Sequence, residues 1–457
     1  MMHRPVTRAA RRPTVRLAVA ASGAALLLAA CAGGPAPGAT PRSEPVSQTE
    51  REEALSTPTE LLFWTWVPDI QNQVDLFMAE YPAIDVELVN VGQGSPHYQK
   101  LRTALRSGRG VPDVAQVEFQ YLSSFTLGEH LMDLAPYGAA ELEDDYADWI
   151  WDQVSEGDAV YGIPQDVGPM GNLYREDLLA QAGVTPPATW EEFAAAARTY
   201  RAAMPDSYLT NLPGNDAGQL VGLLWQSGAR PFGYDGEETV TIDLDTPQVQ
   251  RVVELWDTLI REDLVAVDPD FTDQWYQGLS NGRYASWQAA AWGPVYLQGT
   301  AGTTSGLWRA APIPQWAPGE NVSSNWGGST DAVLTTTQNP VAAAELARWI
   351  NTEEEPAVRL ATEQFLFPAY DPVLTHPDFV GQEAEFYGGQ RVNQVFAEIT
   401  GTVSSDFGWL PFTDYVYASY NETVGAAIAD RDPLAPAVEA WAADLVAYAQ
   451  EQGFTVE

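Results

Sequence analysis

The chain has 457 residues, of which 45 % are hydrophobic and 16 are tryptophan, a composition that excludes a disordered polypeptide. Its 62 acidic residues against 23 basic ones give a formal net charge of −39, which excludes a nucleic-acid partner because no basic stripe is left to neutralise phosphates. The length is too great for one core and suggests two domains.

The first thirty residues have the three parts of an export signal. Five arginines precede an apolar run over residues 17–30, and Cys31, the only cysteine of the chain, follows this run directly. Small residues before a cysteine are typical of a lipoprotein cleavage site, so we expect a signal peptide over residues 1–30 and a lipid on Cys31. The run has about 14 residues against the roughly 20 that cross a bilayer. Arg11-Arg12 leaves twin-arginine export open beside ordinary secretion.

The mature chain that this cleavage leaves is even more acidic. Removing five signal arginines from 23 basic residues leaves 18 against 62 acidic ones, a net charge near −44. No cysteine remains for a disulfide or a thiolate metal site. Residues 31–58 begin with Gly and Pro and continue with polar and acidic residues, which predicts a flexible tether with too little apolar surface to fold.

From residue 60 onward, strands and helices alternate. The apolar run 61–66 predicts a strand. Ile70, Val74 and Phe77 follow at helical spacing, and apolar and acidic residues alternate over 84–88, which predicts a second strand. A helix over about 98–105 and a strand over 113–117 follow, so we expect a parallel α/β sheet. Ligands bind beyond the carboxyl ends of such strands. The polar and aromatic residues at these ends are Trp64, Trp66, Gln93, Gly94, Glu118, Gln120 and Tyr121.

A second unit begins after residues 161–164. Thr189 and Glu192 stand at the spacing of a capping box, which predicts a helix that starts at Trp190. No phosphate-binding loop, nucleophile elbow or pair of histidines at metal spacing is found, so we expect no catalytic residue, metal or cofactor. A glycosidase needs only two carboxylates, and a secreted carbohydrate-active enzyme therefore stays open as an alternative.

Several short segments, taken in order, resemble the family 1 extracellular solute-binding proteins, the sugar-binding lipoproteins of bacterial ABC importers. They are residues 77–86, 112–114, 161–166, 189–193 and 326–329. The resemblance covers nearly all of residues 60–450 and implies a two-lobed α/β fold of the periplasmic-binding-protein type II, with a ligand cleft between the lobes.

The same resemblance implies three crossings between the lobes, which we place near residues 164–169, 327–330 and 367–369. The N-terminal lobe would then hold residues 59–165 and 330–368. The C-terminal lobe would hold residues 166–329 and 369–457. Hinges at the crossings would let the lobes close around a ligand.

A sugar site needs aromatic plates for the apolar face of a pyranose ring and hydrogen-bonding groups for its hydroxyls. Tryptophans in loop-like contexts and carboxylates or amides at strand ends supply both, although core packing is the alternative for each tryptophan and a solvated charge or helix cap for each carboxylate. The candidate ligand-binding residues are Trp64, Trp66, Glu118, Gln120, Tyr121, Asp166, Trp292, Trp326, Gly327, Gly328 and Trp409.

These observations predict a monomeric receptor that is lipid-anchored on the extracytoplasmic face of the cell membrane. The resemblance implies that it binds a sugar or oligosaccharide and delivers it to the permease subunits of an ABC importer. A lipoprotein that presents its ligand to a sensor is the remaining alternative, because it needs the same closing cleft. The identity and length of the sugar stay open.

Overall fold

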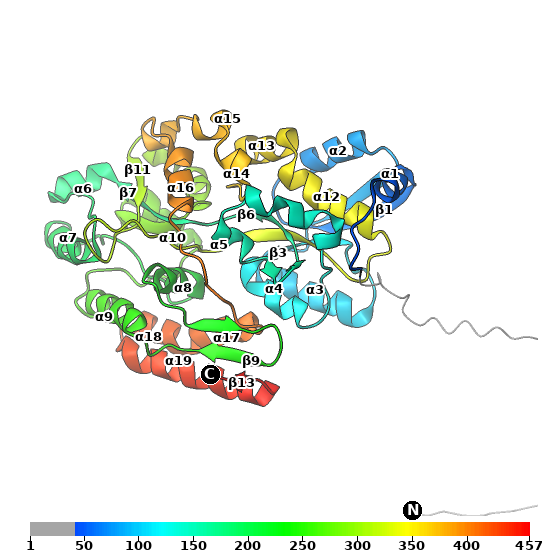
Figure 1. Ribbon diagram of the computed structural model, residues 1–457. Helices are drawn as coiled ribbons and strands as arrows, with labels where there is room; N and C mark the ends of the chain where they lie inside the picture. Colours follow the sequence, from blue (N-terminus) through cyan, green and yellow to red (C-terminus); the bar gives the residue numbers. More distant parts are fainter. Residues whose placement is uncertain (1–41) are drawn as a thin grey trace, which may run out of the picture. The chain divides into compact units, whose positions relative to one another are not determined.

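The computed structural model in Figure 1 describes residues 42–457. The predicted signal peptide and Cys31 lie outside the described residues. Within residues 42–457, no helix is both long enough and apolar enough to span a bilayer.

The first sheet joins strands that lie far apart in the chain. Its order is β2 (Ile84–Val89), β1 (Thr59–Trp64), β3 (Val114–Glu118), β12 (Ser329–Val333) and β6 (Ile163–Asp166). β1 pairs in parallel with β2 and β3, as the sequence predicts, whereas β12 runs antiparallel to β3 and β6. All residues of β12 are buried, because helices cover the faces of a central strand.

Helices predicted from the sequence pack around this sheet. α2 (Gln71–Glu80) and α3 (Ser95–Ser107) confirm the two predicted helices, and α3 buries Tyr98 and Leu101 completely. α12 (Pro340–Thr352) packs on β12 and β6 and also against α2, so that the yellow α12 and the blue α2 lie close together in Figure 1. The remaining helices of this part are α4 (Phe119–Thr126), α5 (Asp148–Trp151) and α13 (Glu354–Glu363), and the hairpin β4 (Ser155–Glu156) and β5 (Ala159–Val160) follows α5.

A second, antiparallel sheet has the order β10 (Ser286–Ala290), β7 (Met170–Arg175), β11 (Trp308–Pro312). A small third sheet has the order β13 (Thr455–Val456), β9 (Thr239–Ile242), β8 (Phe232–Tyr234). The α-helices that follow along the chain, apart from α12 and α13, are α6 (Glu176–Ala182), α7 (Trp190–Ala203), α8 (Ala217–Gln226), α9 (Pro247–Arg261), α10 (Asp273–Asn281), α11 (Gly293–Thr300), α14 (Asp371–Leu374), α15 (Pro377–Val380), α16 (Val392–Thr400), α17 (Thr413–Tyr420), α18 (Ala426–Asp430) and α19 (Leu434–Gln452). α14 and α15 pack against α13.

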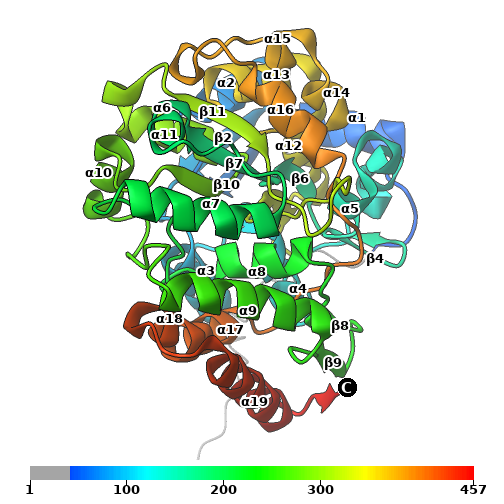
Figure 2. The ribbon, with the colours of Figure 1, turned by 90° about the vertical axis from the view of Figure 1, so that its left-hand side faces the viewer.

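The helices of this second part pack in layers around α8. In Figure 2, α7, α8 and α9 run side by side, and α9 contacts both of the others. Every residue of α8 is buried, because eight of its ten residues are apolar or small and its two glutamines, Gln219 and Gln226, are hydrogen-bonded. α7 begins with the predicted capping box, in which the Glu192 amide donates to the Thr189 hydroxyl at 3.2 Å and the Thr189 amide to the Glu192 carboxylate at 3.3 Å.

Three chain segments that connect the two parts lie side by side. The Val167 amide donates to the Phe367 carbonyl at 3.2 Å, and the Trp326 amide donates to the Gly168 carbonyl at 2.8 Å. Asp166 also forms an isolated bridge with Pro368. The two sheets therefore form the cores of two α/β lobes, and the predicted two-lobed fold is confirmed.

The predicted tether is wrong for residues 48–56, which form helix α1 (Gln48–Ser56). Ser47 and Glu50 make a capping box at its start, and Arg51 forms an ion pair with the buried Glu345 at 3.2 Å and donates to the Tyr137 carbonyl at 3.1 Å. The helix buries no residue of its own. Polar contacts and the half-buried Leu55 hold the helix in place, so a low apolar content does not prevent it from folding.

Candidate functional site

The end of β3 gathers three of the predicted site residues. The Glu118 carboxylate accepts hydrogen bonds from the Tyr98 hydroxyl at 3.0 Å and from the Gln120 side-chain amide at 3.1 Å. Tyr121 stacks on Tyr98 with ring centroids 3.7 Å apart. Burial raises the pKa of Glu118 to about 7. Glu118, Gln120 and Tyr121 thus form one preorganised group.

The side-chain oxygen of Gln120 is an unused hydrogen-bond acceptor within the described part of this group. Gln120 is 5 % exposed, and its Oε1 has no hydrogen-bond partner in the part of the chain that the structure describes. Buried amide oxygens are nearly always paired in folded proteins. The atom lies beside the Glu118 carboxylate, so the two residues together could accept hydroxyl groups from a ligand.

Asp166 ends β6, the edge strand of the first sheet, which β12 separates from β3. Its carboxylate accepts a hydrogen bond from the Ser329 hydroxyl, and burial raises its pKa to about 6. The charge of Asp166 in turn contributes to the raised pKa of Glu118, which places the two carboxylates near each other.

Two further carboxylates, which the sequence analysis missed, come from the second lobe. Asp216 caps α8, with Oδ1 accepting from the Gly218 amide at 2.7 Å, and burial raises its pKa to about 6. Asp270 precedes α10, and burial together with the charge of Asp216 raises its pKa to about 8. The charge of Asp216 also raises the pKa of Glu118, so acidic groups of both lobes face each other. In the sequence, Asp216 has the signature of a helix cap and Asp270 has no signature.

Among residues 42–457, no basic side chain pairs with any of these four carboxylates. Burial is the first cause of each raised pKa, and no arginine, lysine or histidine is among the causes. Glu118, Asp166 and Asp216 nevertheless stay partly accessible to water. Groups that are both strongly desolvated and still reachable by water line a narrow space rather than a dry core.

Trp292 and Trp326 lie together in the second lobe. The Trp292 indole N–H donates to the Trp326 carbonyl at 2.9 Å, and their rings are 5.0 Å apart. Trp326 is 7 % exposed, whereas Trp292 is half-buried. Trp292 also contacts Phe271 and Tyr296 at 6.0 and 5.8 Å. Both packing and ligand contact are therefore open to Trp292, and its role in binding stays a prediction.

The two glycines after Trp326 allow close packing at the start of β12. Gly327 and Gly328 have φ values of +82° and +91°, which favour glycine. A Cβ atom on Gly328 would lie 2.6 Å from a ring carbon of Phe119 and 3.0 Å from the Asp166 carbonyl oxygen. The glycine keeps β12 tight against the start of α4.

Two tyrosines connect the aromatic and acidic groups. The pKa of Tyr417, on α17, is raised well above its ordinary value by burial and then by Tyr121, Asp216 and Glu118. The charge of Asp166 contributes to a raised pKa of Tyr296, on α11. Neither tyrosine was predicted, because each stands in an ordinary helical pattern.

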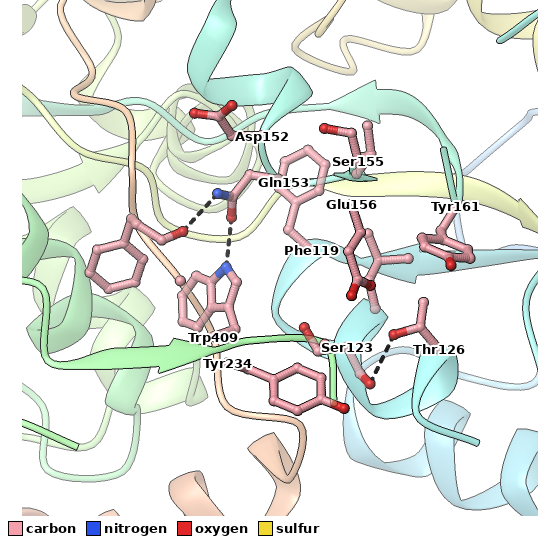
Figure 3. Close-up of a pocket in the computed structure, with 15 residues that line it drawn as sticks. Phe119, Ser123, Thr126, Asp152, Gln153, Ser155, Glu156, Tyr161, Tyr234 and Trp409 are labelled. Atoms are coloured by element: carbon pink, nitrogen blue, oxygen red, sulfur yellow. Dashed lines mark hydrogen bonds between the residues drawn. The ribbon is translucent and has the colours of Figure 1, made fainter. Parts of the chain in front are cut away.

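The other three predicted tryptophans make contacts of their own, and their role in binding stays a prediction. Trp64 is 8 % exposed in β1, and Trp66 packs against His97 at 5.0 Å. Trp409 lines a groove of about 150 Å³ with residues of α4 and of the α5–β4 region (Figure 3). Its indole N–H donates to the Gln153 side-chain oxygen at 2.6 Å. Within residues 42–457 its one ring contact is with Phe407.

Metal binding finds no support in the same range. Among residues 42–457, no group of three or more His, Cys, Asp or Glu side chains is placed to hold a metal ion. The side chains of the site offer hydrogen bonding and ring contact: carboxylate and amide oxygens accept, and aromatic faces pack.

Two α/β lobes joined by three adjacent segments, with acidic and aromatic groups of both lobes gathered together, define a two-lobed ligand-binding protein. The profile of one family, described as bacterial extracellular solute-binding protein, matches residues 65–355. The chain belongs to this family, and the resemblance seen in the sequence is confirmed.

Similar proteins of known name are themselves binding proteins. An arabinooligosaccharide-binding protein of Halalkalibacterium halodurans is 24 % identical, over 76 % of this chain and 80 % of the relative. A lactose-binding protein of Rhizobium radiobacter is 26 % identical, over 74 % of this chain and 81 % of the relative.

Two solved structures are similar to this chain over nearly their whole length. An ABC transporter associated binding protein of B. animalis subsp. lactis, in complex with β-1,6-galactobiose, superposes with a TM-score of 0.77 at 28 % identity, covering 87 % of this chain and 99 % of that one. The galacto-N-biose/lacto-N-biose I-binding protein of Bifidobacterium longum, in complex with lacto-N-biose, gives 0.77 at 25 %, covering 87 % and 98 %.

Proposed function

We propose that this protein is a receptor that binds a sugar or oligosaccharide between its lobes and delivers it to the permease subunits of an ABC importer. The observation that carries the proposal is the convergence of both lobes on one group of side chains. Glu118, Gln120 and Asp166 offer acceptors for hydroxyl groups, and Trp292 with its neighbours offers flat apolar faces. This is the combination that a pyranose ring requires.

The proposal includes a lipid anchor on Cys31 and a monomeric protein on the extracytoplasmic face of the cell membrane. Its lobes are residues 59–165 with 330–368, and residues 166–329 with 369–457. The three adjacent connecting segments serve as the hinge, and closure of the lobes around the ligand signals occupancy to the permease. The candidate residues named from the sequence, together with Asp216 and Tyr417, form the ligand site.

A titration of purified protein with saccharides tests this function. The protein is the mature chain from residue 31 with Cys31→Ser, which removes the lipid. Lactose, β-1,6-galactobiose and lacto-N-biose, the ligands named for similar proteins, are the first probes. A saccharide present at about 100 times its Kd raises the apparent stability by roughly 2.7 kcal/mol. Absence of binding by these and by arabinose, galactose and glucose oligosaccharides would refute the proposal.

We further propose that the protein does not alter its ligand. The family and the similar proteins above are binding proteins. One observation favours the glycosidase alternative, namely the proximity of Glu118, with a pKa of about 7, to other carboxylates. Incubation of a bound saccharide with the protein, followed by an assay for new reducing ends, separates the two functions.

A further inference from the structure

Phe271 has a backbone conformation that phenylalanine rarely adopts. Its φ is +53°, in the left-handed region, and its side chain is 39 % exposed. A bulky residue in this region is strained, and such strain persists only where the surrounding structure fixes the backbone. The position therefore calls for a reason that local sequence preference does not supply.

Two asparagines hold the segment before Phe271 in place. Asn215 donates to the Asp270 carboxylate at 3.0 Å and accepts from the Asp270 amide at 3.0 Å. Asn211 in the same way donates to the Asp268 carbonyl at 2.9 Å and accepts from the Asp268 amide at 2.8 Å. These reciprocal pairs fix the backbone on one side of Phe271. On the other side, the Thr272 hydroxyl caps α10 by accepting from the Trp275 amide at 3.2 Å.

The strained backbone places the Phe271 ring on a base of tryptophans. Its ring centroid lies 5.5, 6.4, 6.0 and 6.2 Å from those of four indoles, which belong to Trp275, Trp287, Trp292 and Trp326. Three of the four are nearly fully buried, and Trp292 is half-buried. The ring is thus supported by a rigid base while a part of it stays open to solvent.

An acceptor for hydroxyl groups lies beside this ring. Trp326 lies between the Phe271 ring and Asp216. Its indole packs directly on Gly218, where a Cβ atom would be only 2.3 Å from the indole nitrogen, and the Gly218 amide donates to Asp216. Asp216 is partly accessible to water, whereas Asp270 is 3 % exposed. Burial raises the pKa of both carboxylates, and the charge of Asp216 raises that of Asp270 further. Asp216 is the one of the two that water reaches, so it is the acceptor open to a hydroxyl group.

We propose that Phe271 and Asp216 form a subsite for one pyranose unit, with the Phe271 ring against its apolar face and the Asp216 carboxylate accepting a hydroxyl. The subsite rests on the proposed saccharide-binding function and adds to it a residue that decides which units bind. A unit without a flat apolar face gains nothing from the ring. Asp270, Asn211 and Asn215 act as positioning residues.

The test compares variants of the mature chain carrying Cys31→Ser by isothermal titration. The probe is whichever of lactose, β-1,6-galactobiose and lacto-N-biose binds the parent chain most tightly. Phe271→Gly relieves the backbone and removes the ring, and we expect its Kd to rise at least tenfold. Phe271→Trp keeps a flat face, and its Kd should stay within threefold of the parent's.

Phe365→Gly is the matched control. Phe365 also has a left-handed backbone, with φ of +60°, and is 52 % exposed. Unlike Phe271, Phe365 has no contact with another aromatic ring among residues 42–457. We expect Phe365→Gly to leave the Kd within twofold of the parent's.

A Kd of Phe271→Gly within twofold of the parent's overturns the subsite and leaves the saccharide receptor standing. If Phe271→Gly fails to fold, Phe271→Leu decides, since leucine keeps apolar packing without a flat face. A Kd for Phe271→Leu equal to the parent's overturns the proposal, and a rise of at least fivefold supports it. If none of the three probes nor any other saccharide of the panel binds the parent chain, the proposed function fails and the subsite with it.

Discussion

Glu118→Gln is expected to stabilise the ligand-free protein at pH 8 and to weaken saccharide binding. The substitution keeps the shape of the side chain and removes its charge. The carboxylate now accepts from the Tyr98 hydroxyl and the Gln120 amide. A glutamine oxygen can keep the bond from Tyr98, and its amide can donate to the free Oε1 of a reoriented Gln120. Both hydrogen bonds of the side chain at position 118 can therefore be kept, and the Gln120 NH2 group turns to the place that its Oε1 has left.

The size of the effect follows from the pKa of Glu118. Burial raises this pKa from 4.5 to about 7, so the folded protein holds the proton more tightly than the unfolded chain does. The stability that this proton contributes is complete below pH 4.5 and is lost as the pH rises through 7. The rise corresponds to about 3 kcal/mol, or about 1–3 kcal/mol once partial access of water is allowed for. For a chain of this length, that is a Tm change of about 1–3 °C.

Thermal unfolding of the ligand-free protein between pH 5 and pH 8 measures the effect. The parent chain should lose stability over this range, and Glu118→Gln should lose less of it. Glu60→Gln removes the same charge from an exposed position on β1 and serves as the control that should follow the parent. Titration with a saccharide at pH 8 should show a Kd at least tenfold higher for Glu118→Gln, since a bond to a charged acceptor contributes about 1.5–3 kcal/mol. Parallel pH profiles for the parent and Glu118→Gln would refute the reasoning.

The other predictions test the anchor, the chemistry and the packing. Cys31→Ser should release folded protein into the medium, and retention in the membrane fraction at the parent's level would contradict the lipid anchor. Prolonged incubation with a bound saccharide should yield no new reducing ends, whereas their appearance, abolished by an acidic-to-amide change, would establish a glycosidase. Trp292→Ala should weaken saccharide binding by about 1–3 kcal/mol. A loss of about 3–5 kcal/mol in unfolding free energy with unchanged affinity would instead assign this tryptophan to the core. Gly328→Ala should lower the unfolding free energy by about 1–3 kcal/mol, because its Cβ would meet Phe119 in a left-handed backbone, and an unchanged midpoint in a denaturant titration would contradict this.

The position of Glu118 at the end of β3 could be predicted from the sequence, because it follows from the pattern of neighbouring residues alone. A strand that ends in Glu118 places the following residues at the carboxyl edge of a parallel sheet, whatever the rest of the chain does. Thr189 and Glu192 likewise define a helix start by their spacing alone. Helix α1 has an equally local signal in the capping box of Ser47 and Glu50. It was not predicted because the segment has few apolar residues.

What the sequence determined by itself is the alternation of elements, the class of fold and the family, because periodicity, caps and short motifs are properties of neighbouring residues. Only the tertiary structure decided which side chains meet. Asp216 lies far from both Glu118 and Asp270 in the chain, yet its charge raises the pKa of each. The ring of Phe271 reaches the surface because paired asparagines and buried tryptophans hold a strained backbone. A raised pKa and a strained φ arise from desolvation and long-range packing, and neither leaves a mark in the order of residues along the chain.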